Sequence, residues 1–207
     1  MEMNHAKTTE NEAKAPMESE EILEICKHSA EGDEKAQRQL MELLHDRIHR
    51  TASFICKNRD DAKDLAQTAC IEVLLSVGSY RGEASLTYWS DRVTIQIAAK
   101  SYSKRTRRDR LFEKFFQPAP PPAGADDQVA RTQVWERLSQ LLHTLKYKQR
   151  EALVLRYIHG YSNQQVADLC NIPMETARAR VKKGRAVLKK KVLADPLLAE
   201  WVLQWGE

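Results

Sequence analysis

Residues 162–191 read SNQQVADLCNIPMETARARVKKGRAVLKKK, a pattern typical of two helices joined by a tight turn. Ser162 and Gln165 have the spacing of a capping box, in which the two residues bond each other's backbone N–H at a helix start. Asn171 tolerates the left-handed conformation that often ends a helix, and Pro173 suits the start of the next one. The stretch therefore predicts a helix-turn-helix.

The second of these helices is strongly basic and has no acidic residue after Glu175. Its basic residues are Arg178, Arg180, Lys182, Lys183, Arg185, Lys189, Lys190 and Lys191. Many charged runs are ordinary solvated faces. Here the capped preceding helix and the turn favour a surface for phosphates, whose neutralisation releases counterions. Double-stranded DNA is the predicted partner. The predicted duplex contacts are Ser162, Thr176, Arg178, Ala179, Arg180, Lys182, Lys183 and Arg185.

The 207 residues carry a net charge of +4, and their length suits one large or two small domains. No apolar run reaches the length of about eighteen residues that a membrane helix needs, and the N-terminus lacks the pattern of a signal peptide. We therefore expect a cytoplasmic protein without stable membrane insertion.

The four cysteines stand singly in helical patterns and form no C-x-x-C pair. They are Cys26, Cys56, Cys70 and Cys170. This spacing indicates neither a disulfide framework nor a zinc site, so core positions are expected. His159 and Cys170 could share a metal, but two scattered ligands are too few to define a site. No metal and no cofactor are predicted.

Apolar residues recur at helical spacing in residues 22–55, 62–77 and 85–104, and no stretch alternates as a strand does. The prolines of residues 118–122 exclude a regular helix and indicate a linker. The predicted fold is all-α, with two small helical domains joined by a Pro-rich linker and a helix-turn-helix ending the second. The predicted boundaries are a tail at 1–18, a domain at 19–111, the linker at 112–131, a domain at 132–194 and an extension at 195–207.

Further motifs accompany the helix-turn-helix in a set order. They are DDAKDLAQ at 60–67, YRG at 80–82, YW at 88–89, LKYKQREALVLRY at 145–157, GYSNQQVA at 160–167 and TARARV at 176–181. From about residue 22 to residue 192, the chain resembles the short, two-domain sigma factors of bacterial RNA polymerase. These are the extracytoplasmic-function (ECF) group of the sigma-70 family.

This resemblance implies that residues 19–111 bind polymerase and recognise and melt the promoter near −10, while residues 132–194 read the −35 duplex. The residues that match the family's polymerase-docking helix are Asp61, Asp64, Leu65, Gln67 and Thr68. Acidic residues in a first helical turn also favour the helix dipole, and both roles can hold together.

Melted DNA needs flat rings on which bases stack and cations that follow the backbone. The residues assigned to the −10 strand are Tyr80, Arg81, Tyr88, Trp89, Arg92, Gln96 and Lys100. Trp89 fits this surface and the core equally well. Gln96, Lys100 and Thr68 depart from the residues usual in the family, so the preferred −10 sequence is not implied.

The predicted function is a sigma factor that binds core RNA polymerase and directs promoter-specific initiation, and that has no catalytic site of its own. The alternative is a helix-turn-helix operator-binding regulator that acts without core polymerase and usually needs a dimer. A nucleic-acid enzyme is disfavoured because neither a phosphate-binding glycine loop nor a metal-carboxylate cluster is recognisable. The expected partners are core RNA polymerase and promoter DNA. The resemblance also allows an anti-sigma factor, although no segment specifies one. Association with the nucleoid is expected in the holoenzyme.

Overall fold

The computed structural model describes residues 19–109, 129–196 and 198–199, and within these ranges it contains helices and no strand. The elements are α1 (Glu20–Ala30), α2 (Glu34–Ile55), α3 (Arg59–Ser76), η1 (Val77–Ser79), α4 (Leu86–Asp109), α5 (Val129–His143), α6 (Tyr147–Leu153), η2 (Val154–Ile158), α7 (Asn163–Cys170) and α8 (Met174–Leu193). The all-α prediction is confirmed. The prolines of residues 118–122 lie outside the described residues.

Side-chain caps start helices α2 and α3. Asp33 accepts a hydrogen bond of 2.8 Å from the Ala36 backbone N–H at the start of α2, and Asn58 accepts one of 2.7 Å from Asp61 at the start of α3. These bonds satisfy N–H groups that have no partner within a helix. Gly32, at φ 92°, makes the turn between α1 and α2.

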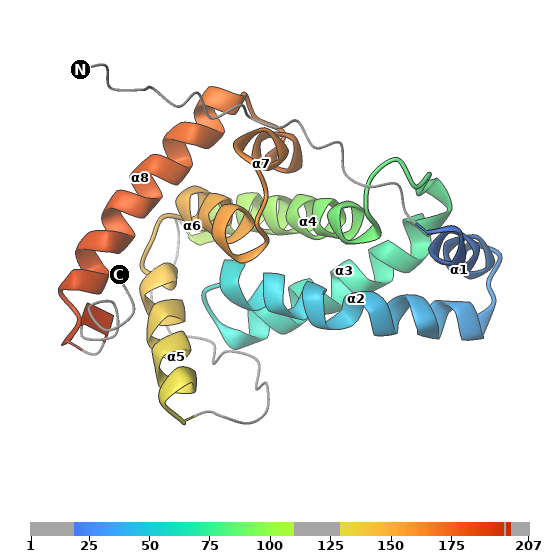
Figure 1. Cartoon of the computed structure of the whole chain (residues 1–207), viewed down its shortest axis with the longest axis horizontal. Helices are drawn as coiled ribbons and strands as arrows, with labels where there is room; N and C mark the ends of the chain where they lie inside the picture. The colour runs from blue at the N-terminus through green and yellow to red at the C-terminus, as the bar shows by residue number, and fades with distance from the viewer. Residues whose placement is uncertain (1–18, 110–128, 197, 200–207) are drawn as a thin grey trace, which may run out of the picture.

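Helices α1 to α4 form the first module, residues 19–109. In Figure 1, α2 and α3 run side by side, α4 lies along them and α1 crosses one end. The inward face of α2 carries Leu40, Leu44 and Ile48, all with no exposed surface, and Val73 of α3 and Ile95 of α4 complete this core. Burying such side chains contributes about 1.5–3 kcal/mol each.

Helices α5 to α8 form the second module, residues 129–199. The helix-turn-helix is confirmed: Ser162 and Gln165 make both bonds of the capping box, and Asn171 adopts the left-handed conformation at φ 51°. Helices α6 and α8 cross closely at Gly184, where an added Cβ would lie 3.1 Å from Leu153 Cδ1. This close approach explains a glycine inside a helix.

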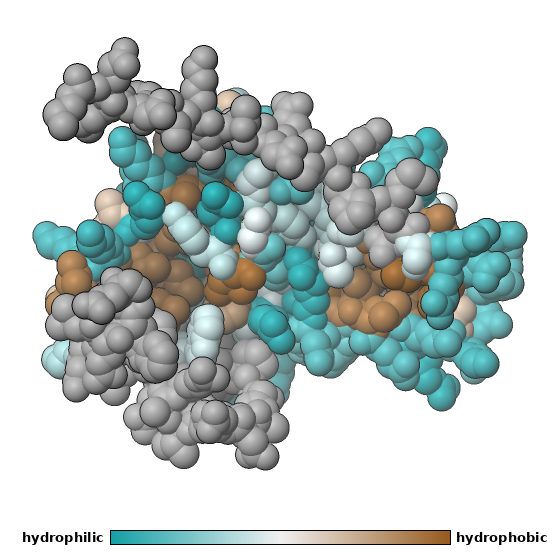
Figure 2. Space-filling view, in the orientation of Figure 1, coloured by the Kyte–Doolittle hydropathy of each residue, from teal (hydrophilic) through white to brown (hydrophobic). Residues whose placement is uncertain are grey.

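The two modules pack against each other. Helix α7 contacts α4, while α5, α6 and η2 contact α2, so that the second module covers one side of the first (Figure 1). Figure 2 shows hydrophobic surface on each module, among α5, α6 and α8 on one and among α1, α2 and α3 on the other. None of the described helices is both long enough and apolar enough to cross a membrane.

Candidate nucleic-acid and polymerase interfaces

One face of α3 is exposed and changes from polar to apolar along the helix. Asp64, Gln67 and Thr68 are exposed at its start. One and two turns later, Ile71 is 51% and Leu75 is 77% exposed. Residues at positions i, i+4, i+7 and i+11 share one helix face. The stripe therefore combines a carboxylate and an amide with two large apolar side chains.

Two residues predicted for polymerase docking have contacts within the first module. Leu65 is 5% exposed and packs in the core, because it follows Asp64 by one position and so points about 100° away from it around the helix. Asp61 is half-buried and accepts a 2.8 Å hydrogen bond from the Asn58 amide in the α3 cap. The sequence-based prediction did not include Ile71 and Leu75, although their spacing from Asp64 places them on the same helix face.

A second stripe runs along α4. Arg92, Gln96 and Lys100 are exposed at four-residue intervals, and half-buried Tyr88 precedes them on the same face. The Tyr88 ring lies edge-on to Tyr161 of the second module, with ring centroids 5.3 Å apart. One face of α4 therefore carries four of the predicted −10 residues. The ring of Tyr88, the first of them, is partly covered by Tyr161.

The remaining −10 residues surround the turn before α4. The Tyr80 hydroxyl donates a 2.7 Å hydrogen bond to the Ala84 carbonyl, and its ring lies 5.5 Å from the half-buried Trp89 ring. Arg81 is exposed. Gly82, at φ 71°, lets the turn approach α1, since an added Cβ would lie 2.7 Å from Leu23 Cδ2. Trp89 therefore packs partly on the core and partly faces outward.

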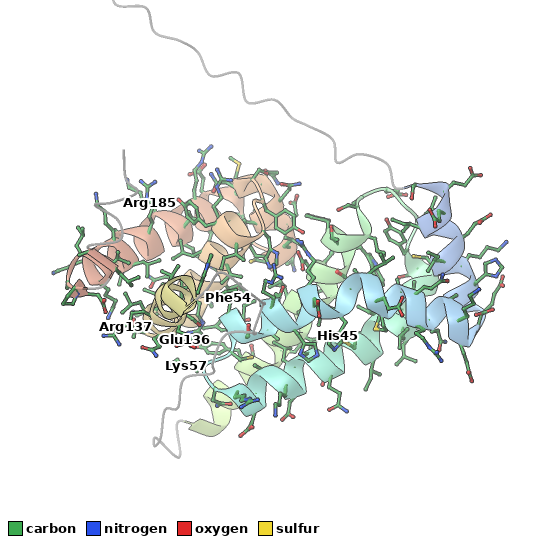
Figure 3. All side chains as sticks on the ribbon, turned by 60° about the horizontal axis from the view of Figure 1, so that its bottom comes forward. His45, Phe54, Lys57, Glu136, Arg137 and Arg185 are labelled. Carbon is green, nitrogen blue, oxygen red and sulfur yellow. The ribbon has the colours of Figure 1, made fainter. Side chains whose placement is uncertain are left out.

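The outer face of α8 is basic. Arg178, Ala179, Lys182, Lys183 and Arg185 are exposed. Figure 3 shows Arg185 projecting from α8 on the side away from the first module. Thr176 is half-buried at the start of the helix, and exposed Ser162 caps α7. Arg178 lies 3.1 Å from Glu175, an exposed pair that water screens strongly.

Arg180 differs from the other predicted duplex contacts. Its side chain is 17% exposed, and Nη1 lies 3.7 Å from Oε2 of Glu151, which is 4% exposed. The Tyr147 hydroxyl donates a 2.9 Å hydrogen bond to Glu151 Oε1. Burial raises the pKa of Glu151, against the lowering effect of Tyr147 and of Arg180. Arg180 therefore points back towards α6 and fixes how α8 lies on it.

A polar cluster that the sequence reading missed lies between the modules, and we call it the Asp91 junction (Arg47, Thr51, Asp91, His159 and Tyr161). Asp91 has no exposed surface and accepts hydrogen bonds from Arg47 Nη2 at 2.7 Å and from the Tyr161 hydroxyl at 2.6 Å. His159 Nε2 lies 3.0 Å from Thr51 Oγ1. Because the Thr51 hydroxyl donates to the Arg47 carbonyl, the ring N–H is the donor to Thr51.

Cys170 and His159, weighed as metal ligands from the sequence, have separate roles. Cys170 lies beside Glu151, and burial raises its pKa. Burial lowers the pKa of His159, with Asp91 opposing the shift. Across the described ranges, no group of three His, Cys, Asp or Glu side chains could hold a metal ion.

Comparison with known proteins places both modules in one family. Residues 40–108 match the family model of sigma-70 region 2, and residues 135–188 match that of sigma-70, region 4. The ECF RNA polymerase sigma factor SigW of Bacillus subtilis is 22% identical over 83% of this chain and 96% of its own. The RNA polymerase sigma-H factor of Pseudomonas aeruginosa is 27% identical over 87% of this chain and 97% of its own.

Solved structures show the same fold. The sigma factor RpoE from Bartonella quintana, in complex with the anti-sigma factor NepR, is 22% identical, with a TM-score of 0.60 over 76% of this chain and 97% of that one. CnrH in complex with the cytosolic domain of CnrY gives a TM-score of 0.58 at 18% identity, over 84% of this chain and 97% of that one. With both sigma-70 regions present in order, the chain belongs to the sigma-70 family as an ECF sigma factor, which binds core RNA polymerase and directs promoter-specific transcription initiation.

Proposed function

We propose that the two modules divide promoter recognition, with α4 capturing the −10 strand and α8 reading the −35 duplex while α3 docks on core polymerase. The observation that carries this proposal is the presence of three differently built exposed faces on one chain. The α8 face is basic and belongs to the helix-turn-helix, the α4 face combines aromatic rings with cations, and the α3 face combines a carboxylate with apolar side chains. Each face suits a different partner.

The α8 face supplies cations to the duplex. Arg178, Lys182, Lys183 and Arg185 extend into solvent without a buried partner among the described residues, so they are free to meet phosphates or base edges. Thr176 and Ala179 stand near the N-terminal end of α8, the part of a recognition helix that enters the major groove. We assign Arg180 a positioning role, because its guanidinium already faces Glu151.

The α4 face suits single-stranded DNA. Arg92 and Lys100 can follow the phosphate backbone, and Gln96 between them offers both a donor and an acceptor to a base. Tyr88 and Trp89 present the rings on which unstacked bases can rest, a contact worth about 1–3 kcal/mol per base. This stacking offsets the few kcal/mol that separating a base from its neighbours costs.

The α3 face suits a helical partner on polymerase. Asp64 and Gln67 provide polar bonds to a basic surface, and Ile71 and Leu75 add apolar area beyond them. Leu43 of α2 is 50% exposed and adds further apolar surface to this module. Exposed apolar residues at helical spacing mark interaction sites more often than isolated ones do.

In this proposal polymerase supplies all the chemistry and the chain has no catalytic residue. Because transcription takes place on the bacterial chromosome, we place the protein in the cytoplasm, at the nucleoid when it is in the holoenzyme. The solved relatives are described as complexes with an anti-sigma factor and with the cytosolic domain of CnrY. We infer from them that a protein of the anti-sigma type regulates this chain too.

The test is transcription with purified core polymerase on a supercoiled promoter library, with start sites mapped by sequencing. Wild-type protein should select a defined set of start sites, and Arg178→Ala should weaken dependence on the −35 element while leaving polymerase binding intact. Lys35→Ala, an exposed change on α2 that belongs to none of the three proposed faces, is the control. Duplex binding without polymerase, and no start-site selection with it, would instead indicate an operator-binding regulator.

A further inference from the structure

The chain continues past α8 into a further helical turn. Helix α8 ends at Leu193, and helical structure resumes at Pro196. Between them, Asp195 Oδ1 accepts a 3.3 Å hydrogen bond from the Leu198 backbone N–H, and the Asp195 carbonyl accepts one of 2.8 Å from Ala199. A side-chain acceptor followed by proline is a common helix start. Asp195 therefore caps a separate turn that follows α8 directly.

The same carboxylate binds α5. Asp195 Oδ2 accepts a hydrogen bond from Arg137 Nε, which lies 58 positions earlier in the chain. In Figure 3, Arg137 projects from α5 on the side where α8 ends. The Asp195 side chain is 5% exposed and that of Arg137 is 51% exposed. Because one partner is buried, water screens this pair less than it screens the exposed pair of Arg178 and Glu175.

A buried apolar side chain strengthens this attachment. Leu198 is 2% exposed, whereas Leu193, at the end of α8, is 56% exposed. Burying Leu198 is favourable because its apolar surface leaves water. We call Arg137, Asp195 and Leu198 the C-terminal clasp. Asp195 and Leu198 lie beyond residues 135–188, which match sigma-70, region 4.

Helix α8 is thus held at two places along its length. It crosses α6 at Gly184, near the contact of Arg180 with Glu151, and the clasp ties its far end to α5. A helix held at one crossing can pivot about it, whereas a second fixed point sets its direction. At about 1.5 Å per residue, Thr176 lies about 12 Å from Gly184 and the clasp about 15 Å from it on the other side. A shift of about 1 Å at the clasp therefore moves the start of α8 by about 0.8 Å.

We propose that the C-terminal clasp positions the recognition helix, because it sets the angle at which the start of α8 enters the major groove. Arg137, Asp195 and Leu198 are positioning residues that act through α8. This inference rests on the proposed reading of the −35 duplex by α8.

The clasp controls sequence preference more than total affinity. A hydrogen bond to a base edge needs a distance of about 3 Å and good alignment, so a small rotation of α8 breaks it. Long basic side chains such as Lys182 and Arg185 still reach phosphates after such a rotation, and phosphate contacts carry no sequence information. Loss of the clasp is therefore expected to reduce discrimination between sequences.

Amide hydrogen exchange of the free full-length protein measures whether the clasp holds α8. Leu198→Ala should lower the protection of residues 187–193 by about tenfold, because it removes buried apolar surface. Asp195→Asn should do the same, since it keeps an oxygen for the Leu198 N–H but loses the charge that pairs with Arg137. The matched control is Leu193→Ala, the same change at an exposed position, which should keep wild-type protection.

Duplex binding by the same full-length proteins measures the consequence. Fluorescence anisotropy at one salt concentration compares a duplex carrying the −35 element of start sites that the wild-type holoenzyme selects with a duplex of scrambled sequence. Leu198→Ala and Asp195→Asn should lower the ratio of the two affinities by about tenfold, as expected for the loss of one base contact. Affinity for the scrambled duplex should stay within about twofold, and Leu193→Ala should match wild type.

A double-mutant cycle tests the ion pair itself. Arg137→Ala should lower the affinity ratio as much as Asp195→Asn does. Combining the two substitutions should lower it no further, because both remove the same pair. Additive losses would show that the two residues act separately and would overturn the clasp.

The positioning role is refuted if the affinity ratio is unchanged in Leu198→Ala and Asp195→Asn. Equal loss of affinity for both duplexes also refutes it, because destabilisation alone would produce that result. Wild-type protection of residues 187–193 in both variants would show that the clasp does not hold α8. A wild type that selects no start site would count against the proposed function, whereas exchange is measured without DNA or polymerase and still decides whether the clasp holds α8.

Discussion

Acidification should loosen the contact between the two modules, because His143 is held neutral where α5 meets the end of α2. Burial, and next the charge of Arg150, lower the pKa of His143 to about 4, while its bond to the Ser53 carbonyl opposes the shift. Lys57, which follows α2, adds to the lowering. Nδ1 has no hydrogen-bond partner within the described part of the chain, so a proton added there would be unsatisfied.

The size of the effect follows from the two pKa values. We call the arrangement with the modules in contact the closed state and the arrangement with the modules separated the open state. In the open state the His143 ring regains water, and its pKa returns to the ordinary value of 6.5. The closed state then binds fewer protons, so its stability is intact above about pH 6.5 and is lost as the pH falls towards about 4. At about pH 5.5, one unit below the ordinary value, protonation of the open state costs the closed state up to about 1.4 kcal/mol, or tenfold.

Scattering of the free protein at about pH 7.5 and about pH 5.5 measures this shift, and the ring C–H resonance of His143 reports its titration directly. His143→Gln, which keeps a donor for Ser53 but cannot titrate in this range, should lose most of the pH dependence and retain only the part due to His159. A His143 resonance that titrates near 6.5 in the closed protein, or equal compactness at both pH values, would refute the reasoning.

The structure also predicts the effects of four further substitutions. Gly184→Ala should destabilise the second module by up to about 2 kcal/mol in urea unfolding, because overpacking against buried Leu153 costs about 1–3 kcal/mol and the gain in helix propensity is about 1 kcal/mol; equal or greater stability would contradict it. Arg185→Ala should reduce the salt slope of duplex binding by about 0.9 if it neutralises one phosphate, and an unchanged slope would remove it from the interface. Leu75→Ser should leave stability within about 0.5 kcal/mol, since the side chain is 77% exposed, yet lower affinity for core polymerase in a titration. Asp64→Arg should lower that affinity as well without changing duplex binding, and loss of both would indicate misfolding.

The helix-turn-helix was predictable residue by residue because its signals are local. The capping box of Ser162 and Gln165 and the left-handed Asn171 depend on backbone groups no more than five residues away. The helices of the first module follow from the same kind of signal, namely apolar periodicity between caps such as Asp33 and Asn58. The division into two sigma-70 regions also followed from short motifs in order.

The direction in which individual side chains point was harder to predict from the sequence. The sequence places Arg180 among exposed basic residues, yet Glu151 on a neighbouring helix turns it inward. Leu65 belongs to a docking motif, yet the packing of α3 places it in the core. In both cases the residue lies on the predicted helix, but its contacts depend on which other helix packs beside it.

By itself the sequence determined the all-α class, the turn between α7 and α8, the basic character of α8 and the family, because each depends on hydrogen bonds and side-chain preferences within a few residues. Only the tertiary structure decided that the two modules meet, since Tyr161 and Arg47 are 114 residues apart and Arg150 and Ile55 are 95 apart. A carboxylate such as Asp91 is ordinary on a helix read alone. It becomes informative once the fold removes it from water, because a buried charge must have partners, and one of them, Tyr161, comes from the other half of the chain.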